Sequence, residues 1–313
     1  MIRSLIAHAT LVIALFSALS AGPVLVQETS AAVLQGDSVT IEPGSSSYSI
    51  EVGGVERSFR VFRPTQLDDP ASLVVMIHGG GGSGAIAEKF YGWDALANRE
   101  HFVVAYPDAL GTAIPAWNTE GNCCGQSGRT GVDDVGFIVA MVDFVQQRLP
   151  IDASRIFATG ISNGGMLDYT LACTTDLFAA IGPVSATMLN DCVDPAPTSV
   201  IHIHGLKDTT VPFDGSIGDG PAKIDGPPIS DVIESWRRFD GCTSAVATTA
   251  GLVTTSTSNC TNGREVELIT VADGEHGWPG AAQKPNGGKQ PSQAIDSTAT
   301  IWAFFADHPK PSD

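Results

Sequence analysis

The segment 160–164 places a serine in a pattern that can do nucleophilic chemistry. It reads Gly-Ile-Ser-Asn-Gly, so Ser162 stands in a G-x-S-x-G motif. A stretch typical of a strand precedes it and a stretch typical of a helix follows, which is the context that the motif requires. Such a turn lifts the serine hydroxyl out at the end of a sheet, beside the free N–H groups of the helix start. We therefore predict that Ser162 is a nucleophile; the alternative is a glycine-rich turn with a capping serine.

Two later residues have the types and the places that such a serine requires. A serine hydroxyl needs a base to take its proton and an acid to orient that base. Where a nucleophile sits in this kind of turn, the acid and then the histidine follow it along the chain. Asp208 and His276 each follow a run typical of a buried strand. Because the carboxyl ends of parallel strands meet at one edge of a sheet, we predict Asp208 as the acid and His276 as the base.

A run of glycines supplies a candidate oxyanion hole. Residues 78–83 read His-Gly-Gly-Gly-Gly-Ser and follow another apolar run. Glycine lets a backbone N–H approach a substrate oxygen closely, and we predict the N–H groups of Gly80 and Asn163 as the donors. A phosphate-binding loop does not fit, because neither G-x-G-x-x-G nor a following Gly-Lys-Ser/Thr is present.

Metal chemistry is the alternative that the histidines and acidic residues raise. His202 and His204 share one face of a predicted strand and could hold a metal ion, but we expect them to be structural. The acidic residues of a later glycine-rich loop lack the spacing of a calcium loop, so we expect them to be solvated: Asp214, Asp219 and Asp225. We predict no metal site and no cofactor, since nucleophilic catalysis by a serine needs neither.

The elements that must position these residues alternate between strands and helices. We expect a hairpin at 46–64, turning at Gly53–Gly54, and long loops at 108–131 and 209–229. We expect strands at 72–77, 101–106, 155–159, 178–184, 199–204 and 265–271, and helices at 85–99, 133–149, 164–173, 229–239 and 293–306. This order predicts an α/β fold with a mostly parallel central sheet, helices on both faces and an antiparallel N-terminal edge.

Charge and the first residues bear on partners and location. With 17 Lys+Arg against 34 Asp+Glu, the net charge of −17 excludes the nucleic-acid backbone and anionic membrane surfaces as partners. Arg3, the apolar run 11–19 and the small residues after it have the layout of a secretory signal peptide. An uncleaved anchor is the alternative, although the run is short for a membrane span. We expect cleavage near 20–21 or 31–32, removal of residues 1–31, and a secreted monomer whose single domain is 32–313.

Six cysteines, all after this leader, fit an oxidising compartment. They allow 15 pairings, of which the closest separated ones join Cys173 to Cys192 and Cys242 to Cys260. Cys123 and Cys124 would then form a vicinal disulfide or stay as two thiols. A zinc site is the competing interpretation, but no C-x-x-C pair or histidine cluster supports it.

Six motifs in order resemble those of a known family: HGGGGSG, AWNTEGNCCG, GVDDVGF, GISNGGML, HIHGLKD and HGWPG. Together they are similar to the extracellular esterases that include polyhydroxybutyrate depolymerases and feruloyl or acetylxylan esterases. The resemblance runs from about residue 48 to 306. It implies an α/β-hydrolase that cleaves esters, with Ser162, Asp208 and His276 as nucleophile, acid and base.

From this we predict a serine carboxylesterase that hydrolyses hydroxyalkanoate esters, as a polyhydroxybutyrate depolymerase does. A feruloyl or acetylxylan esterase is the alternative, and the ester substrate could be polymeric. A serine peptidase or a non-catalytic binding protein of the same fold are weaker rivals, separated by ester and amide assays and by fluorophosphonate labelling.

Two tryptophans and two aspartates flank these motifs. Trp117 and Trp278 could form an apolar wall for the substrate, or pack in the core as tryptophans usually do. We carry both forward as substrate-binding candidates. Asp133 and Asp134 stand at the start of a predicted helix, where we expect capping rather than chemistry.

Overall fold

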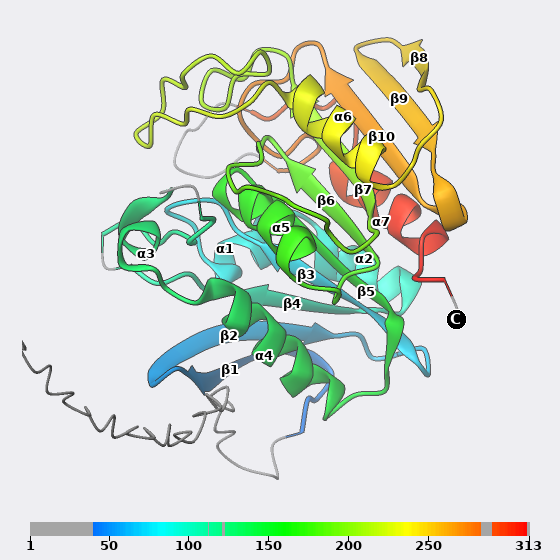
Figure 1. Cartoon of the computed structure of the whole chain (residues 1–313). Helices are drawn as coiled ribbons and strands as arrows, with labels where there is room; N and C mark the ends of the chain where they lie inside the picture. The colour runs from blue at the N-terminus through cyan, green and yellow to red at the C-terminus, as the bar shows by residue number, and fades with distance from the viewer. Residues whose placement is uncertain (1–39, 112, 121–122, 283–289, 312–313) are drawn as a thin grey trace, which may run out of the picture. The chain divides into compact units, whose positions relative to one another are not determined.

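Continuous apolar runs separated by amphipathic stretches build a ten-stranded sheet with helices on both faces (Figure 1). The computed structural model describes residues 40–111, 113–120, 123–282 and 290–311, all within one compact unit, Ala31–Asp313. The expected signal peptide, residues 1–31, lies outside the described residues. Across the sheet the strands follow the order β1-β2-β4-β3-β5-β6-β7-β10-β9-β8.

The six central strands run parallel to one another. They are β3 (Ala71–Ile77), β4 (Val103–Pro107), β5 (Ile151–Ile161), β6 (Ala180–Val184), β7 (Ser199–Gly205) and β10 (Glu265–Val271). Every residue of β3, β4, β6 and β7 is buried, because helices cover both faces of the sheet. The mostly parallel α/β fold expected from the sequence is therefore confirmed.

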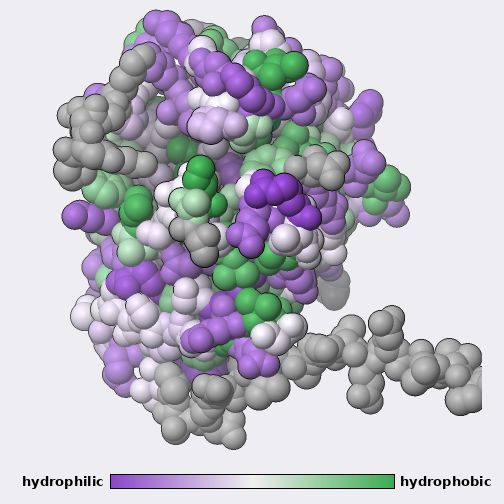
Figure 2. All heavy atoms as spheres, turned by 90° about the vertical axis from the view of Figure 1, so that its left-hand side faces the viewer, coloured by the Kyte–Doolittle hydropathy of each residue, from purple (hydrophilic) through white to green (hydrophobic). Residues whose placement is uncertain are grey.

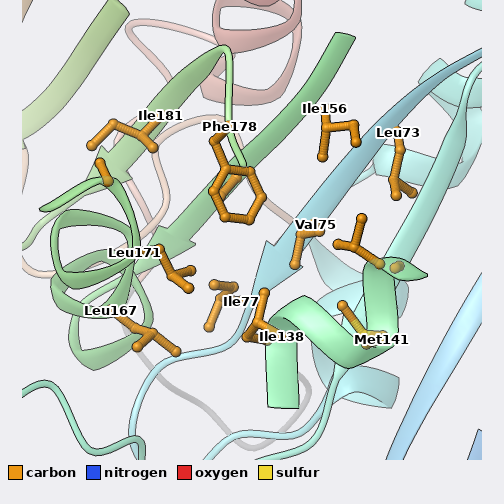
Figure 3. Close-up of a cluster of buried hydrophobic side chains, with 14 of the residues drawn as sticks. Leu73, Val75, Ile77, Ile138, Met141, Ile156, Leu167, Leu171, Phe178 and Ile181 are labelled. Atoms are coloured by element: carbon orange, nitrogen blue, oxygen red, sulfur yellow. The ribbon is translucent and has the colours of Figure 1, made fainter. Parts of the chain in front are cut away.

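Two layers of helices enclose this sheet. On one face lie α4 (Asp134–Gln146), α5 (Asn163–Thr174) and α6 (Ile229–Phe239); on the other lie α1 (Gly84–Phe90), α2 (Trp93–Glu100) and α7 (Ser297–Asp307). Figure 3 shows the first layer, where Val75 and Ile77 of β3 lie near Ile138 of α4 and Leu167 of α5. Burial of such a side chain contributes about 1.5–3 kcal/mol, so this packing holds α5, and the residue just before it, firmly against the sheet.

Both edges of the sheet are antiparallel, and only one of them was predicted. The hairpin of β1 (Gly44–Val52) and β2 (Val55–Arg63) forms as expected and pairs with β4. At the other edge, β9 (Val253–Asn259) pairs antiparallel with β10, and β8 (Val246–Ala250) pairs with β9. All five residues of β8 are exposed. This hairpin buries little, so its sequence lacks the apolar alternation that marks a strand.

Several helix boundaries differ from those predicted. The helix expected at 85–99 is two helices, α1 and α2, because Gly92 adopts the left-handed region with φ of 79° between them. A short helix, α3 (Gly125–Thr130), forms within the expected loop 108–131. The last helix begins at Ser297, where the Asp296 carboxylate caps the N–H of Ala299, and not at residue 293.

The cysteines pair as their spacing indicated. Disulfides join Cys173 to Cys192 and Cys242 to Cys260, and Cys123 is bonded to its neighbour Cys124. No cysteine in the described part of the chain is free. Within these residues no helix is long and apolar enough to cross a membrane.

Neighbouring aspartates at the start of α4 do different structural work. Asp133 is the N-cap, and its side chain accepts the N–H of Gly136 at 2.7 Å. Asp134 is buried; its Oδ1 lies 2.6 Å from the guanidinium of Arg57, and its Oδ2 accepts the N–H of Asn118 at 2.7 Å. The expectation of capping holds for Asp133, whereas Asp134 belongs to a buried ion pair.

The same substitution at these two positions separates a cap from a buried charge. Asp134→Asn leaves the Arg57 guanidinium buried without its counter-charge, and we expect it to lower the free energy of unfolding by about 3–5 kcal/mol. Asp133→Asn keeps a good capping residue, so its effect should stay within about 0.5 kcal/mol. Urea denaturation of both variants measures the difference. Equal effects would show that the ion pair does not stabilise the fold.

Candidate active site

The end of β5 turns sharply into α5, and Ser162 occupies the turn. Its φ is 56° and its ψ is −124°, a conformation that non-glycine residues rarely adopt. The glycine at position 164 permits the turn, because a Cβ there would collide with the carbonyl oxygens of Ile77 and His78. The backbone N–H of Ser162 donates to the carbonyl of Val184 at 2.9 Å. The strand, turn and helix of the G-x-S-x-G prediction are all present.

Asp208 and His276 come together although 67 residues separate them. Nδ1 of His276 lies 2.8 Å from Oδ2 of Asp208. The other carboxylate oxygen accepts the N–H groups of Thr210 at 2.9 Å and Val211 at 2.8 Å. Burial of Asp208 opposes ionisation, but the hydrogen bonds and charge of His276 outweigh it, so the pKa of Asp208 lies below its ordinary value. The carboxylate therefore stays ionised and acceptor-only.

Ser162 and His276 line one pocket of about 660 Å³. The glycine loop 79–82 forms another part of its lining, and an apolar wall is made by Ile86, Phe90, Tyr91, Trp278, Ala281, Ala282 and Pro291. The ring of Trp278 stacks on that of Tyr91 at a centroid distance of 5.0 Å. Figure 2 looks onto the side of the molecule where the loops after the parallel strands gather; hydrophobic side chains there are scattered among hydrophilic ones.

The glycine loop approaches the start of α5 closely. A Cβ built on Gly80 would lie 3.9 Å from the Cβ of Asn163. The N–H groups of Gly81 and Gly82 are already bonded to the carbonyls of Pro115 at 2.7 Å and Gly79 at 2.9 Å. These two glycines are therefore poor oxyanion donors, and Gly80 with Asn163 stays the prediction.

Similarity to known proteins agrees with this arrangement. The model of the prolyl oligopeptidase family matches residues 88–194. The probable feruloyl esterase C of Aspergillus niger is 29% identical over 218 residues, which cover 63% of this chain and 74% of that protein. Feruloyl esterase C of Emericella nidulans is 31% identical over 198 residues, covering 57% of this chain and 67% of the relative.

The chain belongs to the feruloyl esterase family of α/β-hydrolases. It is a carboxylic ester hydrolase. Among solved structures, an acetyl xylan esterase from Aspergillus awamori superposes with a TM-score of 0.59 at 16% identity, covering 83% of this chain and 99% of that one. At this identity the likeness shows a shared fold, which is the α/β-hydrolase fold described above.

Trp117 packs in the core, the second of the two alternatives expected for it, and is not among the residues that line the pocket. The side chain of Trp117 is fully buried and stacks on Phe137, with ring centroids 6.5 Å apart. Trp117 therefore does not form a wall for the substrate. Its indole N–H donates to the carbonyl of His78 at 2.8 Å. The side-chain amide of Asn163 brackets the Trp117 backbone, accepting its N–H at 2.7 Å and donating to its carbonyl at 3.1 Å. Trp117 thus ties the start of the glycine loop to the start of α5.

Some residues that line or support the esterase pocket could not be predicted from a sequence motif. Phe90 and Tyr91 end α1 and face the pocket, but no motif marks them. Ser185, at the end of β6, has a φ of 48°, and its hydroxyl lies 3.1 Å from the carbonyl of Gly277, next to His276. Only the break at Gly92 could have indicated that Phe90 and Tyr91 stand at the end of a helix and not inside one.

His202 and His204 are hydrogen-bonded to each other in the buried interior. Nε2 of His202 lies 2.9 Å from Nδ1 of His204, and both side chains are fully buried. No cluster of three or more His, Cys, Asp or Glu that could hold a metal ion occurs among the described residues. Burial lowers the pKa of both histidines from the ordinary value of 6.5, so they stay neutral in the folded esterase.

This burial predicts a loss of stability in mild acid. The unfolded chain takes up protons on these histidines as the pH falls below 6.5, whereas the folded chain does not. Each histidine should therefore lower the free energy of unfolding between pH 7 and pH 5.5, by up to about 1.3 kcal/mol. Urea denaturation at both pH values measures this, and the fall should be smaller in His204→Gln, in which His202 and the buried His78 still contribute.

Wild type must be compared with His204→Gln because other titrating groups change the free energy of unfolding in the opposite direction as the pH falls. Burial raises the pKa of Asp94 and of Asp240 to about 6, so both gain stability as the pH falls towards their pKa values. They are common to both proteins and cancel in the difference. An identical pH slope in wild type and variant would contradict the assignment.

Proposed function

We propose that this protein is a serine carboxylesterase whose nucleophile, base and acid are Ser162, His276 and Asp208. The observation that carries the proposal is the 2.8 Å hydrogen bond from His276 to Asp208, on a histidine that shares a pocket with the strained Ser162. With Nδ1–H donating to the ionised carboxylate, Nε2 of His276 keeps a lone pair that can accept the proton of a serine hydroxyl.

The reaction then follows from the positions of these groups. Ser162 Oγ attacks the ester carbonyl while His276 takes its proton, and Asp208 stabilises the imidazolium that forms. The N–H groups of Gly80 and Asn163 bind the oxyanion of the tetrahedral intermediate. His276 returns the proton to the leaving alcohol, and water, activated by the same histidine, releases the acid from Ser162.

Removing the nucleophile should abolish turnover without unfolding the protein. We expect Ser162→Ala to lower kcat on p-nitrophenyl acetate by about 10⁴-fold or more, with an unchanged circular dichroism spectrum. Ser235→Ala, on α6 and far along the chain from the pocket residues, is the control and should keep full activity. Activity or fluorophosphonate labelling retained in Ser162→Ala would sink the assignment.

For the substrate, we propose a feruloyl ester of plant cell-wall material rather than the hydroxyalkanoate ester expected first. Relatives that carry the name feruloyl esterase support this alternative better than the depolymerase interpretation. Phe90, Tyr91 and Trp278 line the pocket, and the ring of the half-buried Phe90 can stack on a planar acyl group, because rings stack in offset or edge-to-face geometry. Three disulfides support secretion of the enzyme, with a leader at residues 1–31.

A half-buried wall residue allows the acyl preference to be tested. Loss of one aromatic contact is worth about 0.5–1.5 kcal/mol, so we expect Phe90→Ala to lower kcat/KM on methyl ferulate about 2- to 10-fold. Hydrolysis of p-nitrophenyl acetate, whose acyl group is too small to reach the ring, should hardly change. Phe239→Ala, on α6, is the matched control. Faster cleavage by wild type of hydroxybutyrate oligomers or acetylated xylan than of methyl ferulate would refute the proposed substrate.

A further inference from the structure

A chain of hydrogen bonds crosses the buried interior behind the acid. It begins at Tyr169 on α5, whose hydroxyl lies 2.7 Å from Nδ1 of His202. Nε2 of His202 lies 2.9 Å from Nδ1 of His204, and Nε2 of His204 lies 2.8 Å from the carbonyl oxygen of Val211. The side chains of all three residues are fully buried.

Only one arrangement of protons satisfies every member of this chain. The carbonyl of Val211 can only accept, so Nε2 of His204 carries a proton and, in the neutral ring, its Nδ1 is an acceptor. His202 must then donate from Nε2, which leaves its Nδ1 to accept the hydroxyl proton of Tyr169. The tautomers of both histidines are therefore set by the carbonyl at one end and the phenol at the other.

The chain of hydrogen bonds ends at Val211, whose backbone also binds Asp208. The N–H of Val211 donates to Oδ1 of Asp208 at 2.8 Å, while the carbonyl of the same residue accepts from His204. His204 is thus joined to the carboxylate through a single residue. The direct separation between His204 Nε2 and Asp208 Oδ2 is 3.7 Å, too long for a hydrogen bond.

We propose that His204 is a positioning residue for Asp208: by anchoring Val211, it aims the carboxylate at His276, with Tyr169 and His202 holding it in the required tautomer. The proposal rests on the role proposed for Asp208. Through this chain of hydrogen bonds, α5, the helix that begins next to Ser162, is linked to the loop that carries Asp208.

Two nearly isosteric substitutions separate the two bonds that His204 makes. His204→Gln places an amide N–H near the former Nε2 and keeps the donor to Val211, but it loses the acceptor for His202. His204→Asn places an amide oxygen near the former Nδ1 and keeps that acceptor, but it loses the donor to Val211. Each variant leaves one buried polar group without its partner, so both should lose similar thermal stability.

Their kinetics should nevertheless differ. On p-nitrophenyl acetate we expect His204→Asn to lower kcat at least tenfold with an unchanged KM, and His204→Gln to stay within threefold of wild type. The far-downfield proton resonance of His276 Nδ1–H should persist in His204→Gln and shift or vanish in His204→Asn. Equal losses of kcat in the two variants, in step with their loss of Tm, would show that the chain is structural only.

A measurement on the unaltered enzyme keeps the proposal falsifiable if the variants do not fold. Nitrogen-15 NMR of wild type should show His204 protonated on Nε2 and bare on Nδ1; the opposite tautomer or an imidazolium would overturn the proposal. Asp208→Asn separates this inference from the proposed function. If Asp208→Asn is fully active, the role of Asp208 fails; if it is inactive while His204→Asn is fully active, only the positioning role fails.

Discussion

The site depends on one steric constraint, the close approach of α5 to the end of β3. With no side chain at Gly164, the helix start can lie against the carbonyls of Ile77 and His78, and this forces Ser162 into its left-handed turn. Loss of that approach would move Ser162, the first N–H groups of the helix and the glycine loop together. The cost of the strained turn is met by packing, because α5 is buried along almost its whole length.

Around this turn, each catalytic segment is held by polar contacts from a different direction. The end of β6 bonds the Ser162 backbone through Val184 and contacts the His276 loop through Ser185. Asn163 and Trp117 hold the entry of the glycine loop. Since these contacts are buried and largely satisfied, the geometry is fixed before any substrate arrives, as electrostatic stabilisation of an oxyanion requires.

The parts that could be predicted from the sequence are those whose physics is local. The turn at Ser162 needs glycines at fixed offsets, and buried strands need unbroken apolar runs, so the strand-turn-helix around Ser162 and the central sheet were foreseeable. Trp117 was misplaced because an indole in a polar loop has the same local pattern whether it faces a substrate or the core. Its partner is the carbonyl of His78, 39 residues away, and no spacing rule encodes that contact. The hairpin of β8 and β9 was missed because an exposed strand and a half-buried, Thr- and Ser-rich strand carry no hydrophobic period.

The order of the strands along the chain also affects how the enzyme folds. Ser162 follows β5, Asp208 follows β7 and His276 follows β10, which lies beside β7 in the sheet. A growing chain therefore holds the proposed nucleophile, Ser162, long before the proposed base, His276, and β10 must add to the edge of β7 before the two can meet. Such non-local pairing slows folding, so the proposed base joins the site only in a late step. Fragments that end before residue 276 carry a reactive-looking serine with no means of activating it.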